Sequence, residues 1–496
     1  MISTTHIIGV ILTVAILLAV SWLSARNVKD EKAFIGGGTA GSWMVCGAFL
    51  TTLAGGQSTV GTAQLAFSYG LSAWWFTLGA ALGGVVLAIF YAPSLRRSGC
   101  STLLEIVGKE YGRKVEAVGS MLFLIGIFIS IVAQVLTSSA MIGSLFDLST
   151  LWSLIIGATL IMLFVIFGGI KSAGAGGIVK LLLLYCGSVA TGIIVWRMAG
   201  GIDGFARGID NVYCSPTIAT LNGLDGIESI HHRYGSMLAR GVMKDLGGCL
   251  SLVLGVVSTQ TYAQCIWAGV TTGKARRGAL YCAFFIPVIG AACTLVGLYM
   301  RGHYITAAEL EALQRAGESL PEGIGVIASS AQAFPSFILQ HLPAWFGGLM
   351  LGALLINILG CGSGLMLGAS TILVRDVIAN VQRRFGTGKS CMSQLLLTRI
   401  SIVVLLAIAV VVANTFNGAF INDLGFLSLG LRAVAIIFPL SFALWRPHRY
   451  SSRNVMLAMI AGTAAMLLAN TLSLPGDAVY YGLITSLLII LFPRRK

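Results

Sequence analysis

Charged residues are scarce in this sequence. Only 10% of the 496 residues are Asp, Glu, Lys or Arg, and 56% are hydrophobic, whereas about 25% charged residues is usual for a soluble globular protein. No stretch is polar over a length that would form a separate soluble domain. The shortage of charge therefore argues against a soluble protein and predicts one all-α, membrane-embedded domain over residues 1–496.

The sequence also lacks the spaced motifs of catalysis and metal binding. It has no nucleophile elbow, no His-Glu-x-x-His segment, no Cys-x-x-Cys segment and no paired intramembrane carboxylates. Ten cysteines are present, but nine of them lie in or beside apolar segments or on one predicted side of the membrane, so no disulfide framework is indicated. We expect no enzyme, no catalytic residues, no cofactor and no metal apart from a possible coupling ion.

Apolar runs of about 17 to 25 residues fill most of the chain, and this is the length that crosses about 30 Å of hydrocarbon. The first run lacks the basic start and the small-residue cleavage site of a signal peptide, so we expect it to be retained. The 62 glycines suit close helix packing in lipid. Thirteen transmembrane helices are predicted, at 7–23, 43–67, 72–91, 119–142, 151–167, 178–198, 247–266, 279–300, 344–372, 396–413, 424–445, 454–471 and 479–493.

Positive charge is distributed unevenly among the loops. A net charge of +14 would also suit a nucleic-acid-binding protein, but one set of loops carries 22 Lys and Arg residues and the opposite set carries 7. Because cytoplasmic loops are enriched in Lys and Arg, we expect a cytoplasmic (inner) membrane protein in contact with lipid, with its N-terminus outside, its C-terminus inside and no nucleic acid partner. In the long outer loop 301–343, Thr306, Glu309 and Gly317 predict a short capped helix.

Two predicted spans contain glycine-rich polar segments near their middle. Residues 51–59 read TTLAGGQST, and residues 357–365 read NILGCGSGL. Unwound backbone at that depth is tolerated only where it is buried in protein or lines a cavity, and in transporters such breaks form substrate and ion sites. Glycine-mediated contacts of unbroken helices are the alternative. Together the two segments favour a secondary transporter of a small solute.

Longer stretches of the chain occur in a distinctive order. They are GTAQLAFSYGLSAWW at 61–75, TLLEIVGKEYG at 102–112, STQTYAQ at 258–264, LPAWFGGLMLGALL at 342–355 and ASTILVRD at 369–376. Their order and spacing resemble the sodium:solute symporter family over nearly the whole chain. The resemblance implies a five-plus-five inverted repeat and a monomer. The implied parts are a leading helix 7–23, repeats at about 43–198 and 243–445, and two trailing helices within 454–493.

The resemblance also implies where a coupling sodium ion would bind. Its ligands would be the backbone carbonyls of Leu50, Leu53 and Asn357 and two hydroxyl side chains. At the two hydroxyl positions this chain has Gly360 and Cys361. Glycine offers no side-chain ligand, and a thiol is a poor ligand for a hard cation that prefers oxygen. This departure predicts that sodium coupling is weakened or absent.

A second departure points the same way. The family tends to carry Thr-Asp near the inner end of the fifth core helix, where this chain has Gly176 and Gly177, and Lys180 stands at a position that is usually Gln. The Lys180 ammonium could take the place of the ion or carry a coupling proton. Snorkelling of Lys180 at the cytoplasmic edge is the alternative. Proton-coupled transport and sodium-independent transport are therefore alternatives to Na⁺-coupled transport.

By the same resemblance, the substrate binds between the broken helix and four other core helices. The candidate substrate-binding residues are Gln57, Ser58, Trp75, Phe76, Gln134, Gly255, Thr259 and Arg432. Gly255 replaces a gating Tyr of some sugar-transporting members, which disfavours a sugar held by that gate. Trp75 could instead be an interfacial anchor, and Arg432 could bind a substrate carboxylate or be held by helix-end carbonyls. A small polar organic solute is expected, and a transporter-like sensor that signals through a partner protein is the alternative function.

Overall fold

Helices account for every apolar run of the sequence. The computed structural model describes residues 3–26, 40–146, 148–168, 176–224, 226–374, 394–416 and 418–491. Within these residues, each of the thirteen expected spans coincides with one helix or with consecutive helical segments. In the described part of the chain, eight helices are long and apolar enough to cross a membrane, and nine if the bent pair Val242–Ser258 and Gln260–Ala268 is one span. The helical membrane fold is thus confirmed, and the number of thirteen spans stays a prediction.

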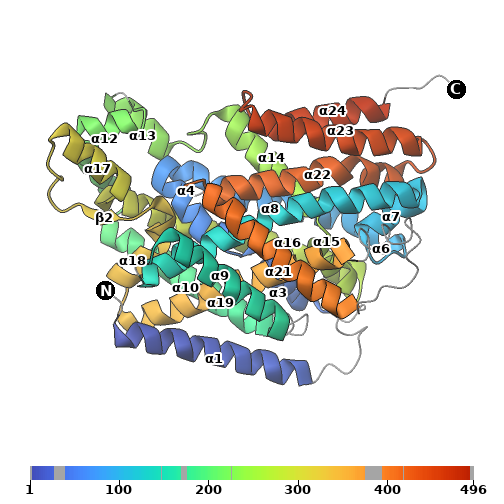
Figure 1. The fold of residues 1–496 in the computed structure, drawn as a ribbon, viewed down its shortest axis with the longest axis horizontal. Coiled ribbons are helices and arrows are strands. Elements are labelled where there is room, and N and C mark those ends of the chain that lie inside the picture. Colours follow the sequence, from blue (N-terminus) through green and yellow to red (C-terminus); the bar gives the residue numbers. More distant parts are fainter. Residues whose placement is uncertain are drawn as a thin grey trace.

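The first part of the chain forms a leading helix and then a series of helical segments, several of which follow one another directly (Figure 1). Its elements are α1 (Thr4–Arg26), α3 (Ser42–Leu53), η1 (Gln57–Gly61), α4 (Thr62–Tyr69), η2 (Gly70–Trp74), α5 (Trp75–Val86), η3 (Leu87–Tyr91), α6 (Ala92–Arg97), α7 (Leu103–Tyr111), α8 (Arg113–Phe146), α9 (Thr150–Leu163), η4 (Phe164–Gly168) and α10 (Gly176–Ala199).

The second part adds the remaining long helices. They are α14 (Val242–Ser258), α15 (Gln260–Ala268), α16 (Thr272–His303), α19 (Ala344–Ile372), α21 (Gln394–Thr415), α22 (Ile421–Trp445), α23 (Ser452–Thr471) and α24 (Ala478–Leu491). In the core, α22 packs against α8 and α14, α16 packs against α3, α4 and α5, and α19 packs against α1 and α8.

Short elements cover one end of the bundle and are called the cap here. The cap consists of α11 (Ile202–Val212), α12 (Pro216–Leu221), α13 (Gly226–Gly235), β1 (Tyr304–Thr306), α17 (Ala307–Ala316), β2 (Gly325–Ile327), η6 (Ser330–Gln332) and α18 (Ala333–His341). The capped helix expected in this region is confirmed as α17, because the Thr306 and Glu309 side chains form a capping box and Gly317 ends the helix with a φ of 73°. The parallel pairing of β1 with β2 was not expected from the sequence. In Figure 1, α1 begins at the cap end and α24 ends at the opposite end.

The Glu309 carboxylate makes the cap sensitive to acid. Burial alone would raise the pKa of Glu309, but the Arg301 guanidinium at 2.9 Å and hydrogen bonds from Thr306 and Asn222 hold that pKa below its usual range. Such a carboxyl contributes stability that is fully present above the pKa of the unfolded chain and is lost as the pH falls through the lower folded-state pKa. We expect the Tm to fall on acidification below about pH 4, and to fall less in Glu309→Gln, in a series of melting curves from neutral to acid pH. Equal falls in both proteins would contradict this.

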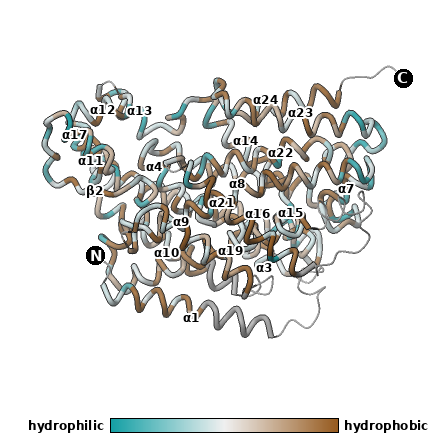
Figure 2. The backbone as a smooth tube through the Cα atoms, viewed as in Figure 1, coloured by the Kyte–Doolittle hydropathy of each residue, from teal (hydrophilic) through white to brown (hydrophobic). Residues whose placement is uncertain are grey.

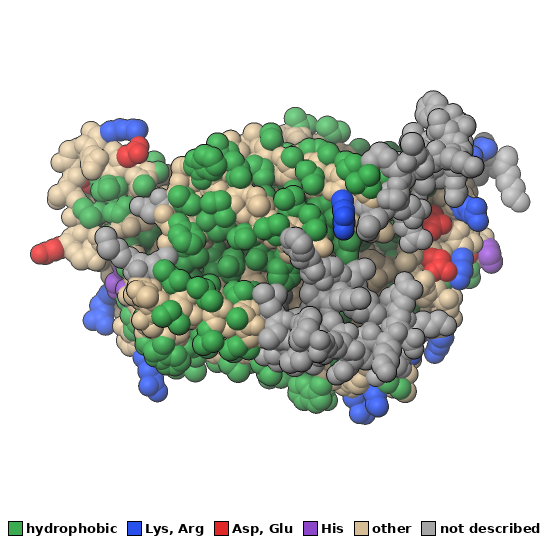
Figure 3. Space-filling view, turned by 60° about the horizontal axis from the view of Figure 1, so that its bottom comes forward, with side chains coloured by type: hydrophobic (Ala, Val, Ile, Leu, Met, Phe, Trp, Pro, Cys, Tyr) green, Lys and Arg blue, Asp and Glu red, His purple; other side chains and the backbone are tan. Residues whose placement is uncertain are grey.

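Apolar side chains face outward along the middle of the bundle. The hydropathy of the backbone is highest along the long helices and lowest in the cap and in the loops of the opposite end (Figure 2). Figure 3 shows hydrophobic side chains over the middle of one face and most charged side chains toward its two ends. Ile11, Phe284, Val411 and Leu488 are among the exposed large hydrophobic residues. Continuous exposed apolar surface of this kind marks contact with lipid, as expected for a multi-pass membrane protein.

Candidate functional site

The second expected span is broken in its middle. Helix α3 ends at Leu53 because Ala54 leaves the helical conformation, with φ −79° and ψ 56°. The chain resumes as the π-helical segment η1, and the Ser58 and Thr59 hydroxyls donate to the Gly55 carbonyl oxygen at 2.9 and 3.1 Å. The unwinding expected at 51–59 is therefore confirmed, and the unbroken helix is excluded for this span.

The second glycine-rich segment, 357–365, is not unwound. It lies inside α19, which runs without a break from Ala344 to Ile372. A Cβ atom on Gly362 would lie 3.1 Å from the Ile161 side chain, so this glycine allows close approach of α9. The alternative of a helix contact is the correct one here, because the small residues bring neighbouring elements close without loss of backbone hydrogen bonds.

Helix α19 donates hydrogen bonds to the backbone of the broken helix. The Asn357 side-chain amide donates to the Ala54 carbonyl oxygen, and the Cys361 thiol donates to the Thr51 carbonyl oxygen at 3.5 Å. Asn357 is buried, and Gly360 between the two donors adds no side chain. The resemblance implied only a backbone carbonyl from Asn357, so the position of its amide is a new feature of the site.

The remaining ion-site candidates lie at the end of α3 and at the start of α10. Leu50 and Leu53 lie in the last turn of α3 and are buried, and the Leu50 carbonyl oxygen accepts a hydrogen bond from the Ala54 N–H at 2.7 Å. Gly177 and Lys180 lie near the start of α10. The side chain of Lys180 falls outside the described part of the chain, so its position relative to α19 stays a prediction.

Two candidate substrate residues, Gln57 and Gln134, lie at the break. A Cβ atom on Gly55 would lie 3.3 Å from the Gln134 amide nitrogen, which reaches across from α8. A Cβ atom on Gly425 would lie 3.2 Å from the Gln57 amide nitrogen, so Gln57 extends from η1 toward α22. The hydroxyl of Ser58 is used within the break itself.

The sequence reasoning missed a third carboxamide at the same place. Asn422 is fully buried in the first turn of α22. Its oxygen Oδ1 faces Gly61 so closely that a Cβ on that glycine would collide with it, and its nitrogen donates to the Thr62 hydroxyl at 3.3 Å. Asn422 lies two residues before the predicted span 424–445, so the sequence analysis did not place it inside the membrane-embedded part.

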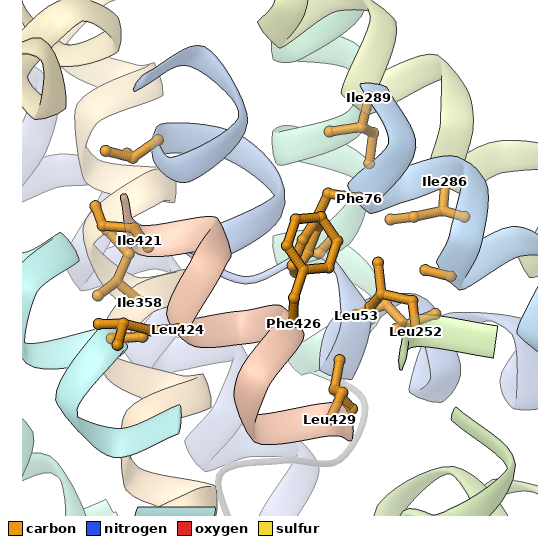
Figure 4. Close-up of a cluster of buried hydrophobic side chains, with 14 of the residues drawn as sticks. Leu53, Phe76, Leu252, Ile286, Ile289, Ile358, Ile421, Leu424, Phe426 and Leu429 are labelled. Atoms are coloured by element: carbon orange, nitrogen blue, oxygen red, sulfur yellow. The ribbon is translucent and has the colours of Figure 1, made fainter. Parts of the chain in front are cut away.

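An aromatic pair lies beside Gln57. The Phe76 ring of α5 and the Phe426 ring of α22 have centroids 5.4 Å apart and face each other within a cluster of buried aliphatic side chains (Figure 4). The Arg240 guanidinium lies 5.5 Å from the Phe426 centroid. Arg240 also pairs with Asp245 at 2.9 Å and with Asp423 at 2.5 Å. Phe76 is thus placed with Gln57, and an ion-pair network joins the start of α22 to the start of α14.

Two further candidate substrate residues, Trp75 and Gly255, make contacts with other parts of the protein than Gln57 does. The Trp75 indole N–H donates to the Met237 carbonyl oxygen at 2.6 Å, so this side chain binds the segment between α13 and α14. A Cβ atom on Gly255 would collide with Leu429, so this glycine allows α14 to pack closely against α22. A larger residue at this position would separate these helices.

Arg432 is buried in the middle of α22. Its guanidinium donates to the Ser428 carbonyl and hydroxyl at 3.2 and 2.8 Å, to the Ser130 hydroxyl at 2.9 Å and to the Thr259 hydroxyl at 3.3 Å. No carboxylate among the described residues forms an ion pair with it. Arg432 therefore joins α22 to α8 and to the bend between α14 and α15, through hydroxyl groups more than through helix-end carbonyls.

Solved structures similar to this chain are transporters. A Na⁺-coupled sialic acid symporter in a substrate-bound, outward-open state has a TM-score of 0.68 and 16% identity, with 99% of this chain and 96% of that chain covered. Mhp1, a nucleobase-cation-symport-1 family transporter in a closed conformation with bromovinylhydantoin bound, has a TM-score of 0.53 and 11% identity, with 92% of each chain covered. These likenesses give the fold, which is the five-plus-five inverted-repeat transporter fold.

Sequence comparison leads to the same group of proteins. An uncharacterized symporter of Bacillus subtilis (strain 168), YwcA, is 21% identical over 471 residues, which are 93% of this chain and 84% of that protein. The model of the sodium:solute symporter family matches residues 33–462. Because that match covers most of the chain, the protein belongs to the sodium:solute symporter family.

Proposed function

We propose that the protein is a secondary transporter that moves a small polar organic solute across the cytoplasmic membrane by alternating access. Family membership supports transport by symport over an enzymatic role. We place the repeats at 43–198 and 243–445. Each proposed repeat begins with a broken helix, since α3 and α4 are separated by the break at Ala54 and α15 is bent by 50° from α14. Such paired discontinuous helices are the usual site of binding in inverted-repeat transporters.

The cap is proposed to face the outside, and the transporter is proposed to work as a monomer. The loops of the cap end carry few Lys and Arg residues, whereas Arg96, Arg97, Lys109 and Arg113 lie at or near the ends of α6, α7 and α8 at the opposite end. Because positive residues favour the cytoplasmic side, this distribution supports an outer N-terminus and an inner C-terminus.

Sodium coupling is proposed to be weak or absent, and the hydrogen bonds from α19 to the broken helix carry this proposal. A sodium ion at this place would need the carbonyl oxygens at the end of α3 as ligands. In this chain the Asn357 N–H and the Cys361 S–H point at the carbonyls of Ala54 and Thr51, which directly follow the expected ligands Leu53 and Leu50 in the sequence, so both donors lie beside the expected ion position. A donor hydrogen carries partial positive charge, so it satisfies the carbonyl and repels a cation. Gly360 supplies no oxygen that would compensate.

The test compares the Tm of purified protein in sodium chloride and in choline chloride. We expect no sodium-specific change for the wild type. The triple variant Asn357→Ala, Gly360→Ser, Cys361→Ser removes the amide donor and supplies two hydroxyl oxygens, one of them in place of the thiol, so it is expected to gain a saturable sodium effect. At a hundred times the dissociation constant, the gain would be about 2.7 kcal/mol.

Gly364→Ser is the matched control, because it adds a hydroxyl to the same helix at a glycine that has no neighbour within 4 Å of its Cβ position. The Tm of Gly364→Ser in sodium chloride should equal its Tm in choline chloride, as expected for the wild type. Saturable, sodium-specific stabilisation of the wild type would overturn the proposal. A lower Tm of Lys180→Gln in both salts would support an ammonium in the place of the ion and direct further work to proton coupling.

A further inference from the structure

Three carboxamide side chains surround the break in the second span. Gln57 comes from η1, Gln134 from α8 and Asn422 from α22. Each approaches the segment 55–61 or the adjoining turn of α22, as shown by their contacts at Gly55, Gly61 and Gly425. The three helical elements that supply them are far apart in sequence, so this arrangement is produced by the fold.

Each of these carboxamides has a buried atom without a hydrogen-bond partner among the described residues. The atoms are the nitrogen of Gln57 and the side-chain oxygens of Gln134 and Asn422. An unsatisfied buried polar group destabilises the folded protein, and such groups are rare in folded proteins. One donor and two acceptors thus remain available to a bound molecule.

A fourth buried carboxamide nearby, that of Gln64, has hydrogen-bond partners for both its nitrogen and its oxygen. Gln64 of α4 donates to the Ala419 carbonyl oxygen at 3.2 Å and accepts a hydrogen bond from the Ile421 N–H at 2.9 Å. Its amide therefore joins α4 to the start of α22. The sequence places Gln57 and Gln64 two turns apart, yet only Gln64 is fully used by the protein.

The elements around the break carry almost no free charge. From Ser42 to Tyr69, and in α8 beyond Glu116, the chain has no charged residue, and α22 has only Asp423 and Arg432. Asp423 pairs with Arg240, and Arg432 donates to four oxygen atoms of the protein. Arg432 keeps its charge, but it lies ten residues along α22 from Asn422, which is about 15 Å at 1.5 Å per residue. A charged solute at the three carboxamides would therefore lack an adjacent counter-ion, and burying a charge without one is costly.

Apolar surface adjoins the carboxamides. A Cβ atom on Gly425 would lie 2.8 Å from Cε2 of Phe76 and 3.2 Å from the nitrogen of Gln57, so the aromatic pair and the amide lie on the same side of α22. Figure 4 shows the Phe76 ring against Phe426. A ligand here would meet polar groups at one edge and aromatic surface at another, which is the usual composition of a small-molecule site.

We propose that Gln57, Gln134 and Asn422 recognise an uncharged solute that both donates and accepts hydrogen bonds, such as a polyol or a carboxamide, and that the site rejects carboxylates. This inference rests on the proposed transport function and names its substrate class. The Gln134 amide is then a ligand-binding group, and the ligand-free protein loses nothing when that amide is removed.

The first test measures the Tm of the ligand-free protein and needs no knowledge of the solute. Gln134→Met keeps the length of the side chain and removes an oxygen that has no partner, so its Tm should equal or exceed that of the wild type. Gln64→Met is the matched control, and it should lower the Tm by about 2 °C or more because two hydrogen bonds are lost. If Gln134→Met is destabilised as much as Gln64→Met, the amide has a structural role and the proposal is overturned.

The second test measures the Tm with paired compounds that differ in charge. The pairs are glucose with glucuronate, nicotinamide with nicotinate, and uracil with orotate. An uncharged compound should raise the Tm of the wild type, and this rise should disappear in Gln134→Met and remain in Gly364→Ser. Stabilisation by a carboxylate that disappears in Arg432→Gln would overturn the proposal.

Uptake of the stabilising compound into proteoliposomes distinguishes the proposed transport function from the proposed substrate class. Uptake of an uncharged compound supports both. Binding of an uncharged compound without uptake or exchange supports the substrate class and counts against transport. Uptake of a carboxylate alone supports transport and overturns the substrate class.

Discussion

Arg301→Met is expected to destabilise the folded protein by about 3 to 5 kcal/mol, because it leaves a buried carboxylate without its partner. Arg301 at the end of α16 is 1% exposed. Its guanidinium pairs with Glu309 at 2.9 Å and donates to the Tyr213 hydroxyl at 2.8 Å. It also lies 5.1 Å from the centroid of the Phe67 ring. One side chain thus joins α17 and the residue that follows α11 in the cap to α4 and α16 of the bundle.

Arg315→Met is the control for this prediction. Arg315 also pairs with a glutamate of α17, Glu311, at 3.2 Å, but both side chains are mostly exposed. An exposed pair one helical turn apart contributes about 0.5 kcal/mol or less, so Arg315→Met should unfold nearly as the wild type does. Both variants are measured by denaturant unfolding of purified protein. Equal losses in the two variants would show that the Arg301 pair is not the link between cap and bundle.

A double variant checks the physical cause. In Arg301→Met combined with Glu309→Leu, no buried charge is left unpaired, so part of the lost stability should return. The double variant could instead lose as much unfolding free energy as the two single variants lose together. The loss would then come from packing around Phe67 and Tyr213 and not from the uncompensated carboxylate.

The helices and the first break could be predicted because their causes are local. Runs of apolar residues long enough to cross the hydrocarbon give the helices, and Gly55 and Gly56 give the break after α3. The capped helix α17 follows from Thr306, Glu309 and Gly317, all within one short segment. In each case the residues that decide the structure are neighbours in the sequence.

The contacts across the site could not be predicted because they depend on how distant helices pack. The segment 357–365 has as many small residues as the first break, yet α19 continues through it. Asn357 was expected to contribute only its backbone carbonyl and Cys361 only a poor thiol ligand, whereas both side chains donate to the backbone opposite. Glycines are a local cause that permits a break, as at Gly55 and Gly56, but whether a helix continues through such a segment also depends on what packs against it, as in α19, and a single sequence does not contain that second part.

Gly70→Ala is expected to cost about 3 kcal/mol or more. Gly70 ends α4 with φ 58° and ψ −132°, a conformation that residues with a Cβ atom rarely adopt and that costs about 1 to 3 kcal/mol. A Cβ atom here would also lie less than 3.0 Å from backbone atoms of Tyr234 in α13. Because backbone cannot move aside as a flexible side chain can, this overlap adds a further 1 to 3 kcal/mol or so.

Gly99→Ala separates these two causes. Gly99 also has a positive φ, 65°, but no atom lies within 4 Å of its Cβ position, so only the conformational cost of about 1 kcal/mol applies. In Gly70→Ala the overlap displaces Tyr234, whose hydroxyl lies 2.7 Å from that of Tyr213, a hydrogen-bond partner of Arg301. The loss in Gly70→Ala should therefore not add to that in Arg301→Met when the two are combined, since both disrupt the same contact between cap and bundle. Full additivity, or equal losses in Gly70→Ala and Gly99→Ala by denaturant unfolding, would mean that the close approach of α13 to Gly70 does not help to hold the cap.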